Sequence, residues 1–241
     1  MIITGRDREG GVLPGRARES RRLLRAEFFY LAALAAFAVL AVLAHAYAYF
    51  AWDLSLARSI QSNDSRAFAA FMDWASVFGN RWTPHALTVA TALAFFIRRR
   101  RSEAAGLVLS AGGGSILSNA FKLLVARPRP TAELVGFAYQ SSEKSFPSGH
   151  VIFYVCYFGF LFFVAYALLP RGSLARRASL VLAALPVAVV GVSRVYLRAH
   201  WPSDVLGAYL LSGVWLAFSL AIYRRWKRSA AFHSEEVMSD E

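Results

Sequence analysis

The chain has 241 residues, of which 57% are hydrophobic and 17% charged, and its formal net charge is +12. This composition is too apolar for an ordinary soluble domain, and a single cysteine, Cys156, excludes intrachain disulfides and thiolate metal clusters. The positive charge could indicate nucleic-acid binding. The distribution of the basic residues along the chain tests that function.

The first 26 residues are basic and have no apolar pattern. They contain seven arginines, and we expect residues 1–26 to form a mobile cytosolic arm. A cleaved signal peptide is the competing interpretation. It is disfavoured because the apolar run that follows, Phe28 to Ala51, is longer than a typical signal core and lacks an obvious small-residue cleavage site.

Six apolar runs are candidates for membrane-spanning helices. The second run is marginal, because it has about 16 residues where ~17 are usually needed. The runs are Phe28 to Ala51, Trp82 to Ile97, Glu103 to Val125, His150 to Leu169, Leu174 to Leu197 and Ser203 to Tyr223.

A further amphipathic helix is predicted between the first two runs. Phe68, Phe71, Met72, Ala75 and Phe78 recur there at helical spacing among polar residues. This pattern fits a helix lying in the membrane interface, and it fits equally a loop helix that covers the bundle.

The basic residues predict the orientation of the chain. Eighteen of the 27 Lys and Arg residues lie on alternate sides of successive runs, in the arm and in three later clusters. The pattern predicts an all-α integral membrane bundle of six helices over residues 27–224, with both termini in the cytosol and a polar cytosolic tail over residues 225–241. Clusters of this kind are topology signals, so a nucleic-acid partner is not expected.

The stretch from Ser193 to Asp204 places ionisable side chains between two apolar runs. Such residues at the edge of a spanning segment indicate a functional site. His200 and Asp204 are four residues apart. If a helix begins after Trp201 with Pro202 in its first turn, the carboxylate can reach back to the imidazole and fix its tautomer.

A second motif follows the third run. Ser110, Gly114 and Ser118 recur every four residues, a spacing that lets helices approach closely, and Lys122 continues this row. Arg129 follows on a proline-stiffened segment. A snorkelling lysine and a topology arginine are the simpler interpretations of these two residues.

The third motif is Pro147-Ser148-Gly149-His150, at the start of the fourth run. Ser148 and Gly149 at a helix start offer free N–H groups and the positive end of the helix dipole, which favours an anion site. An ordinary serine N-cap is the simpler interpretation. Three isolated histidines, His45, His85 and His233, are expected to lie apart from the site.

Together the motifs predict chemistry on phosphate. Arginine and lysine neutralise phosphate oxygens, while one imidazole attacks phosphorus and a second protonates the departing oxygen. Asp204 is the only acid in these motifs, and no H-E-x-x-H pattern occurs, so neither a metal nor another cofactor is expected.

The three motifs resemble a known family at every defining position and in order. Lys122 with Arg129-Pro130 is similar to K-x6-R-P, residues 147–150 match P-S-G-H, and residues 193–204 match S-R-x5-H-x3-D. These are the motifs of the type 2 phosphatidic acid phosphatases, which are membrane lipid phosphatases. Residues 1–100 match no motif.

The resemblance implies a six-helix bundle and metal-independent hydrolysis through a phosphohistidine. It implies that His200 is the nucleophile, Asp204 its orienter and His150 the general acid. The implied phosphate-binding residues are Lys122, Arg129, Ser148, Gly149 and Arg194.

We therefore expect an integral membrane phosphatase acting on a lipid phosphate or diphosphate, in a bacterial inner membrane, with its site facing away from the cytosol. A vanadate haloperoxidase shares these motifs, but that group is soluble and six spans argue against it. A non-catalytic lipid-phosphate binding or transport protein on the same scaffold is the alternative from another class. Phosphatidic acid, phosphatidylglycerophosphate, a polyprenyl diphosphate and a lipid A phosphate all present the terminal phosphate that such a site would bind.

Overall fold

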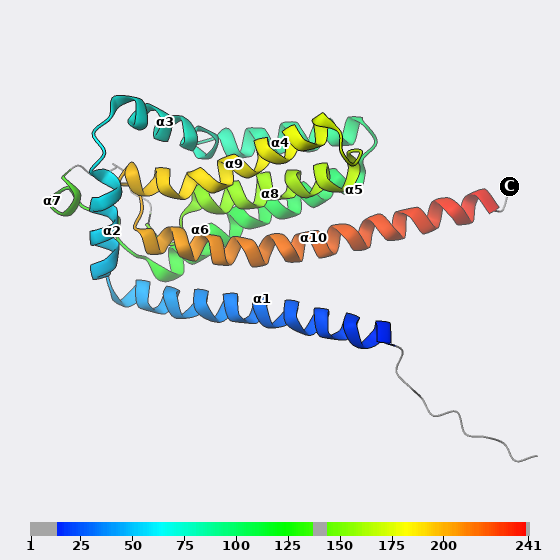
Figure 1. Ribbon diagram of the computed structural model, residues 1–241, viewed down its shortest axis with the longest axis horizontal. Helices are drawn as coiled ribbons and strands as arrows, with labels where there is room; N and C mark the ends of the chain where they lie inside the picture. The colour runs from blue at the N-terminus through cyan, green and yellow to red at the C-terminus, as the bar shows by residue number, and fades with distance from the viewer. Residues whose placement is uncertain (1–13, 137–143, 240–241) are drawn as a thin grey trace, which may run out of the picture.

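The computed structural model describes residues 14–136 and 144–239, and within these residues the regular elements are all helical. The predicted all-α fold class is thus confirmed for the described part of the chain (Figure 1). The elements are α1 (Pro14–Ala46), α2 (Ala51–Gln61), α3 (Arg66–Ser76), the 3-10 turn η1 (Val77–Gly79), α4 (Thr83–Ile97), α5 (Arg101–Leu107), the π-helical turn η2 (Val108–Gly112), α6 (Gly113–Val125), α7 (Ala132–Val135), α8 (Gly149–Leu168), α9 (Leu174–Tyr196) and α10 (Pro202–Ser239).

The long helices run side by side, and α2 crosses one end of the bundle, where α3 and α7 also lie (Figure 1). Within residues 14–136 and 144–239, five segments are long and apolar enough to cross a membrane, whereas α4 has only 15 residues. At 1.5 Å per residue α4 extends about 22 Å, less than the ~30 Å of a hydrocarbon core. The five segments are Glu27–Ala46, Arg101–Val125, Gly149–Leu168, Leu174–Tyr196 and Pro202–Arg228.

Helix α8 lies at the centre of the bundle. It is apolar all round and packs against α5, α6, α9 and α10, which is the pattern expected of a fully surrounded helix. Val151, Tyr154, Cys156 and Phe160 are completely buried. Because α8 begins at Gly149, the third motif lies at the N-terminus of this central helix.

The small-residue row on η2 and α6 faces α8. Ser110 Oγ donates a hydrogen bond of 2.8 Å to the carbonyl of Cys156, and a Cβ added at Gly114 would lie 2.8 Å from Cys156 Sγ. Even an alanine at position 114 would force the helices apart. This close packing carries Lys122 to the end of α6, beside the start of α8.

The first apolar run is shorter than expected. Helix α1 ends at Ala46, not at Ala51, and residues 47–50 turn the chain into α2, which the sequence pattern did not predict. The turn is stabilised because Arg127 Nε donates to the carbonyls of Tyr47 and Ala48, at 3.3 and 3.1 Å. These carbonyls are at a helix end and have no partner within α1.

The amphipathic segment forms α3, which packs against α9. Met72 and Ala75 are buried while Phe71 and Trp74 are exposed, so α3 does cover the bundle.

The first and last helices are longer than the sequence predicted. Helix α1 begins at Pro14, so residues 14–26 are helical where a mobile arm was expected, and residues 1–13 of that arm lie outside the described part. Helix α10 continues through the predicted polar tail to Ser239.

Candidate active site

A cavity of about 490 Å³ opens at the end of the bundle where α3 lies. Six of the eight predicted site residues line it: Lys122, Arg129, Gly149, His150, Arg194 and His200. The other two, Ser148 and Asp204, are buried and do not line the cavity. The fold therefore brings the three motifs together.

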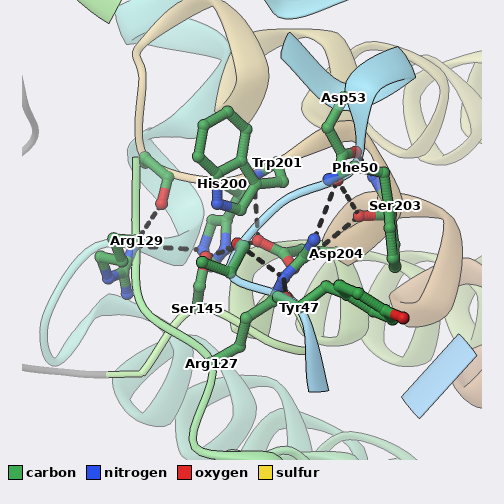
Figure 2. Close-up of polar contacts among 12 residues, drawn as sticks. Tyr47, Phe50, Asp53, Arg127, Arg129, Ser145, His200, Trp201, Ser203 and Asp204 are labelled. Atoms are coloured by element: carbon green, nitrogen blue, oxygen red, sulfur yellow. Dashed lines mark hydrogen bonds and ion pairs between the residues drawn. The ribbon is translucent and has the colours of Figure 1, made fainter. Parts of the chain in front are cut away.

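His200 lies between α9 and α10, on a turn made possible by Arg198, which has a positive φ of 59°. The imidazole is 2% exposed. Its Nε2 atom is 3.4 Å from Arg129 Nη1, and its Nδ1 atom is 3.5 Å from Asp204 Oδ2 (Figure 2). Nδ1 faces the carboxylate at this distance without a hydrogen bond among the described residues. If the proton is on Nδ1, Nε2 carries the lone pair on the other side of the ring.

Asp204 is the third residue of α10, which begins at Pro202 as the sequence predicted. Its Oδ2 atom accepts hydrogen bonds from Ser145 Oγ at 2.5 Å and from the backbone N–H of Trp201 at 2.9 Å. The second bond ties the carboxylate to the start of its own helix. Both contacts hold Oδ2 on the side of His200 (Figure 2).

His150 is held by the segment between α3 and α4. Its Nε2 atom is 2.9 Å from Asn80 Oδ1, and a Cβ added at Gly79 would lie 2.3 Å from Cδ2 of the ring. If Nε2–H donates to Asn80, the other ring nitrogen, Nδ1, is left to exchange a proton. Only glycine leaves room for the ring at position 79.

The start of α8 lies close to the cationic groups. A Cβ at Gly149 would be 3.3 Å from Ser118 Oγ and 3.6 Å from Lys122 Nζ. Ser148 is the N-cap residue, but its side chain makes no capping hydrogen bond, and its buried Oγ has no partner among the described residues. The simpler interpretation of Ser148, an ordinary side-chain N-cap, is therefore wrong.

Backbone and hydroxyl groups orient the two arginines. Arg129 Nη1 donates to the carbonyl of Ala199 at 2.6 Å. Arg194 Nη1 donates to Ser76 Oγ at 3.1 Å, and Ser76 Oγ lies 2.5 Å from Ser193 Oγ. The Ser193–Ser76 contact also joins α9 to α3, which explains a polar residue at position 193.

The concentration of positive charge acts on His200. Burial lowers the pKa of His200 well below its ordinary value of 6.5, and the nearby charges of Arg129, Arg194 and Lys122 lower it further. The imidazole is therefore neutral at neutral pH and keeps the lone pair that a nucleophile needs.

Several cavity residues were missed in the sequence. Asn80 and Ser76 belong to no motif, and polar residues of this kind are common in loops and helix ends, so no signal distinguished them. His85 lines the cavity, so the expectation that it lies apart from the site is wrong. His45 is not among the lining residues, and the side chain of His233 lies outside the described part.

Comparison with known proteins gives the family. A sequence model described as the PAP2 superfamily matches residues 103–228, just over half of the chain. The chain belongs to the PAP2 superfamily, and the resemblance seen in the three motifs is confirmed.

Two named relatives share part of this sequence. Phosphatidylglycerophosphatase B of Bacillus subtilis is 31% identical over 126 residues, which are 52% of this chain and 60% of that protein. An undecaprenyl-diphosphatase of Sulfolobus acidocaldarius is 26% identical over 173 residues, which are 69% of this chain and 76% of that protein. The match to the Bacillus protein thus covers less than two thirds of its length.

Two solved structures share the fold. The transmembrane PAP2 type phosphatidylglycerolphosphate phosphatase of Bacillus subtilis superposes with a TM-score of 0.68 at 24% identity, over 82% of this chain and 97% of the other. LpxE of Aquifex aeolicus has a TM-score of 0.54, also at 24% identity, over 71% and 96%. These likenesses establish a PAP2 membrane phosphatase fold.

Proposed function

We propose that this protein is a metal-independent phosphatase that hydrolyses a lipid phosphate or diphosphate through a phosphohistidine at His200. The observation that carries the proposal is that the two histidines and the three cationic side chains of the motifs meet at one cavity with the start of α8. Similarity to phosphatidylglycerophosphatase B and to an undecaprenyl-diphosphatase supports the reaction class. A binding or transport protein would need the cations but not the second histidine.

The proposed reaction has two steps, and each has a donor or acceptor in the cavity. Nε2 of His200 attacks phosphorus and forms the N–P bond, the bond from phosphorus to the lipid oxygen breaks, and His150 gives that oxygen its proton. His150 then takes a proton from water, whose oxygen attacks phosphorus. His200 departs as neutral imidazole and inorganic phosphate is released.

The phosphate oxygens would be held by Lys122, Arg129, Arg194 and the first N–H groups of α8, with Ser148 and Gly149 shaping that helix start. Charged donors of this kind stabilise the negative charge of the phosphoryl group throughout the transfer. Asp204 would stabilise the positive charge that develops on His200, as the carboxylate of a catalytic triad does.

A lipid substrate is supported by an apolar cavity of about 300 Å³ on α3. Trp74, Phe78 and Pro186 contribute to its walls, while Ser76 and Gly79 of the same segment line the polar cavity. The α3–η1 segment therefore offers a polar surface for the phosphate of a lipid and an apolar surface for its hydrocarbon part. Phosphatidic acid, phosphatidylglycerophosphate, a polyprenyl diphosphate and a lipid A phosphate all remain within this proposal.

We further propose six membrane crossings, with α4 as the short one, both termini in the cytosol and the cavity facing the periplasm or exterior. The first residues of α1 and the last of α10 lie at the same end of the bundle, away from α2 (Figure 1). Basic clusters at 98–101 and 224–228 support a cytosolic location for that end. Thinning of the bilayer can accommodate the length of α4.

The two histidines can be separated with an aryl phosphate, whose nitrophenolate departs without a proton. In excess chelator, the His150→Ala protein should release a burst of nitrophenol near one per enzyme and retain acid-labile phosphate, because its first step no longer needs the acid but its second step still needs the base. The His200→Ala protein should give neither product.

A burst from His200→Ala and none from His150→Ala would mean that the roles are exchanged. Native turnover by both variants would place the chemistry elsewhere. A native protein that binds lipid phosphates but releases no phosphate would be a binder.

A further inference from the structure

Behind His200, on the side away from the cavity, lies a group of polar side chains that are 0 to 1% exposed. We call Asp53, Arg127, Ser203 and Asp204 the buried cluster. Its members come from α2, from the segment after α6, and from the first turn of α10. Asp53 and Arg127 have no role in the proposed reaction described above.

The guanidinium of Arg127 is fully engaged within the cluster. Nη1 donates to Asp204 Oδ1 and to Ser203 Oγ, both at 2.6 Å, and Nη2 donates to Asp53 Oδ2 at 2.9 Å (Figure 2). Nε donates to the two carbonyls at the end of α1, and the ring of Phe50 lies 4.9 Å from the guanidinium carbon. Arg127 thus binds protein groups on every edge and does not line the cavity.

Asp53 occupies the same place in α2 that Asp204 occupies in α10. Each is the third residue of its helix, and each accepts from the N–H of the residue before that helix, Phe50 at 3.2 Å and Trp201 at 2.9 Å. Asp53 also accepts from the backbone N–H and the hydroxyl of Ser203, at 2.8 and 2.7 Å.

The charges of the buried cluster leave one net negative charge, because two carboxylates share one guanidinium. The groups whose positive charges lower the pKa of His200, together with His150, lie on the cavity side of the ring. These groups are Lys122 on α6, Arg129 after it, His150 on α8 and Arg194 on α9. Arg81, His85 and the acid Asp73 also line the cavity. Among the described residues, the carboxylate that lies within ion-pair distance of the His200 ring is Asp204, at 3.5 Å, so the cluster supplies the closest negative charge for a positive imidazole.

We propose that Asp53 and Arg127 are positioning residues for the hydrolysis proposed above, on which this inference rests. Arg127 binds Asp204 Oδ1 and so fixes the rotation in which Oδ2 faces Nδ1 of His200. Asp53 holds Arg127 and keeps the cluster negative, so that the positive charge on His200 is stabilised when its Nε2 attacks phosphorus. A buried ion pair adds little net stability, so a purely structural role explains the cluster less well.

The test is Asp53→Asn in the full-length, detergent-solubilised protein, assayed with one phosphate substrate over a range of pH. We expect kcat to fall roughly ten- to hundredfold with KM changed less than about threefold, as when a partner behind a functional histidine is removed. Loss of a negative charge makes protonated His200 less favourable. The acid limb of the pH profile, which is the fall of kcat/KM at low pH, should therefore move to lower pH by about one unit.

Two further variants test the same inference independently if Asp53→Asn folds poorly. Arg127→Lys keeps the positive charge but loses the guanidinium that binds Asp204 through Nη1 and Asp53 through Nη2. We therefore expect kcat to fall with no shift of the acid limb. The double variant Asp53→Asn/Arg127→Gln retains the net charge of the native cluster, so its acid limb should return to the native position. Asp64→Asn, an exposed acid just after α2, is the matched control and should behave as native.

The inference is overturned if kcat per folded Asp53→Asn enzyme equals the native value, even where its Tm is lower. It is equally overturned if the acid limb moves up towards pH 6.5, because that is the direction expected when the site merely opens to water. An inactive native protein would refute the proposed function itself, whereas an active native protein with unchanged variants would refute only this inference.

Discussion

At the scale of single residues, the two imidazoles differ in what holds them. His200 lies against a carboxylate and is buried, whereas His150 lies against the neutral amide of Asn80, 2.9 Å from its Nε2. A carboxylate stabilises positive charge on the ring it faces, and an amide does so much less. In the proposed reaction His150 loses its positive charge when it gives up its proton, whereas His200 keeps a positive charge in the phosphohistidine. The nearby carboxylate therefore supports His200 as the proposed nucleophile.

The lowered pKa of His200 gives a prediction on pH. A nucleophilic imidazole must be unprotonated, so the acid limb of kcat/KM that belongs to His200 should lie below pH 6.5. Arg129→Gln removes a positive neighbour and should move this limb to higher pH, while Arg129→Lys should leave it in place. Both variants would be measured on the same substrate, so that the ionisation of the substrate cancels. A limb that moves to lower pH in Arg129→Gln would contradict the assignment.

At the scale of elements, the site depends on two segments that carry no motif. The α3–η1 segment holds Arg194 through Ser76 and makes room for His150 at Gly79. Helix α2 meets the first turn of α10 through Asp53 and Ser203. The motif residues are therefore placed by contacts that come from the first 100 residues.

Gly79→Ala should test the fit between η1 and His150. The added Cβ would lie 2.3 Å from the ring, closer than real contacts allow, so the imidazole must move. We expect kcat on a lipid phosphate to fall by roughly 10²-fold, the lower range for loss of a general acid, with a smaller effect on an aryl phosphate. Gly213→Ala, where no described atom lies within 4 Å of the added Cβ, is the matched control. Equal activity of the two variants would show that His150 is not constrained by Gly79.

At the scale of the whole molecule, the chain separates its charges by location. The cavity and its cations lie at the end of the bundle with α2 and α3, and the arginine clusters at 98–101 and 171–177 lie at turns between helices on the opposite side of the predicted topology. This separation is the basis of the proposed orientation.

Single cysteines should test the orientation. Asn63→Cys lies between α2 and α3, and Arg171→Cys lies between α8 and α9; both positions are exposed. An impermeant thiol reagent applied to intact cells should label position 63 and not position 171, because only the first is proposed to face outward. The native protein is the control, since Cys156 is buried. Labelling at 171 alone would place the cavity in the cytosol.

The sequence by itself determined the class of the molecule and the content of its site. Long apolar runs have no stable alternative to membrane helices, because a bilayer leaves backbone groups no other partner. The spacing of Lys122, Arg129, Ser148 to His150, Arg194, His200 and Asp204 specified which side chains belong together. Pro202 marked the start of α10, because proline is accommodated in a first helical turn.

Only the tertiary structure decided how these groups are supported. Arg127 pairs with Asp53 and Asp204, which are 74 and 77 residues away in the chain. It also binds the turn after α1, at Tyr47 and Ala48, from 80 and 79 residues away. No local pattern encodes such pairs, since the sequence around an arginine beside a membrane helix is alike whether the arginine marks topology or is buried. Asn80, Gly79 and Ser76 become part of the site because α3 folds back on α9, and that contact is a property of packing in three dimensions.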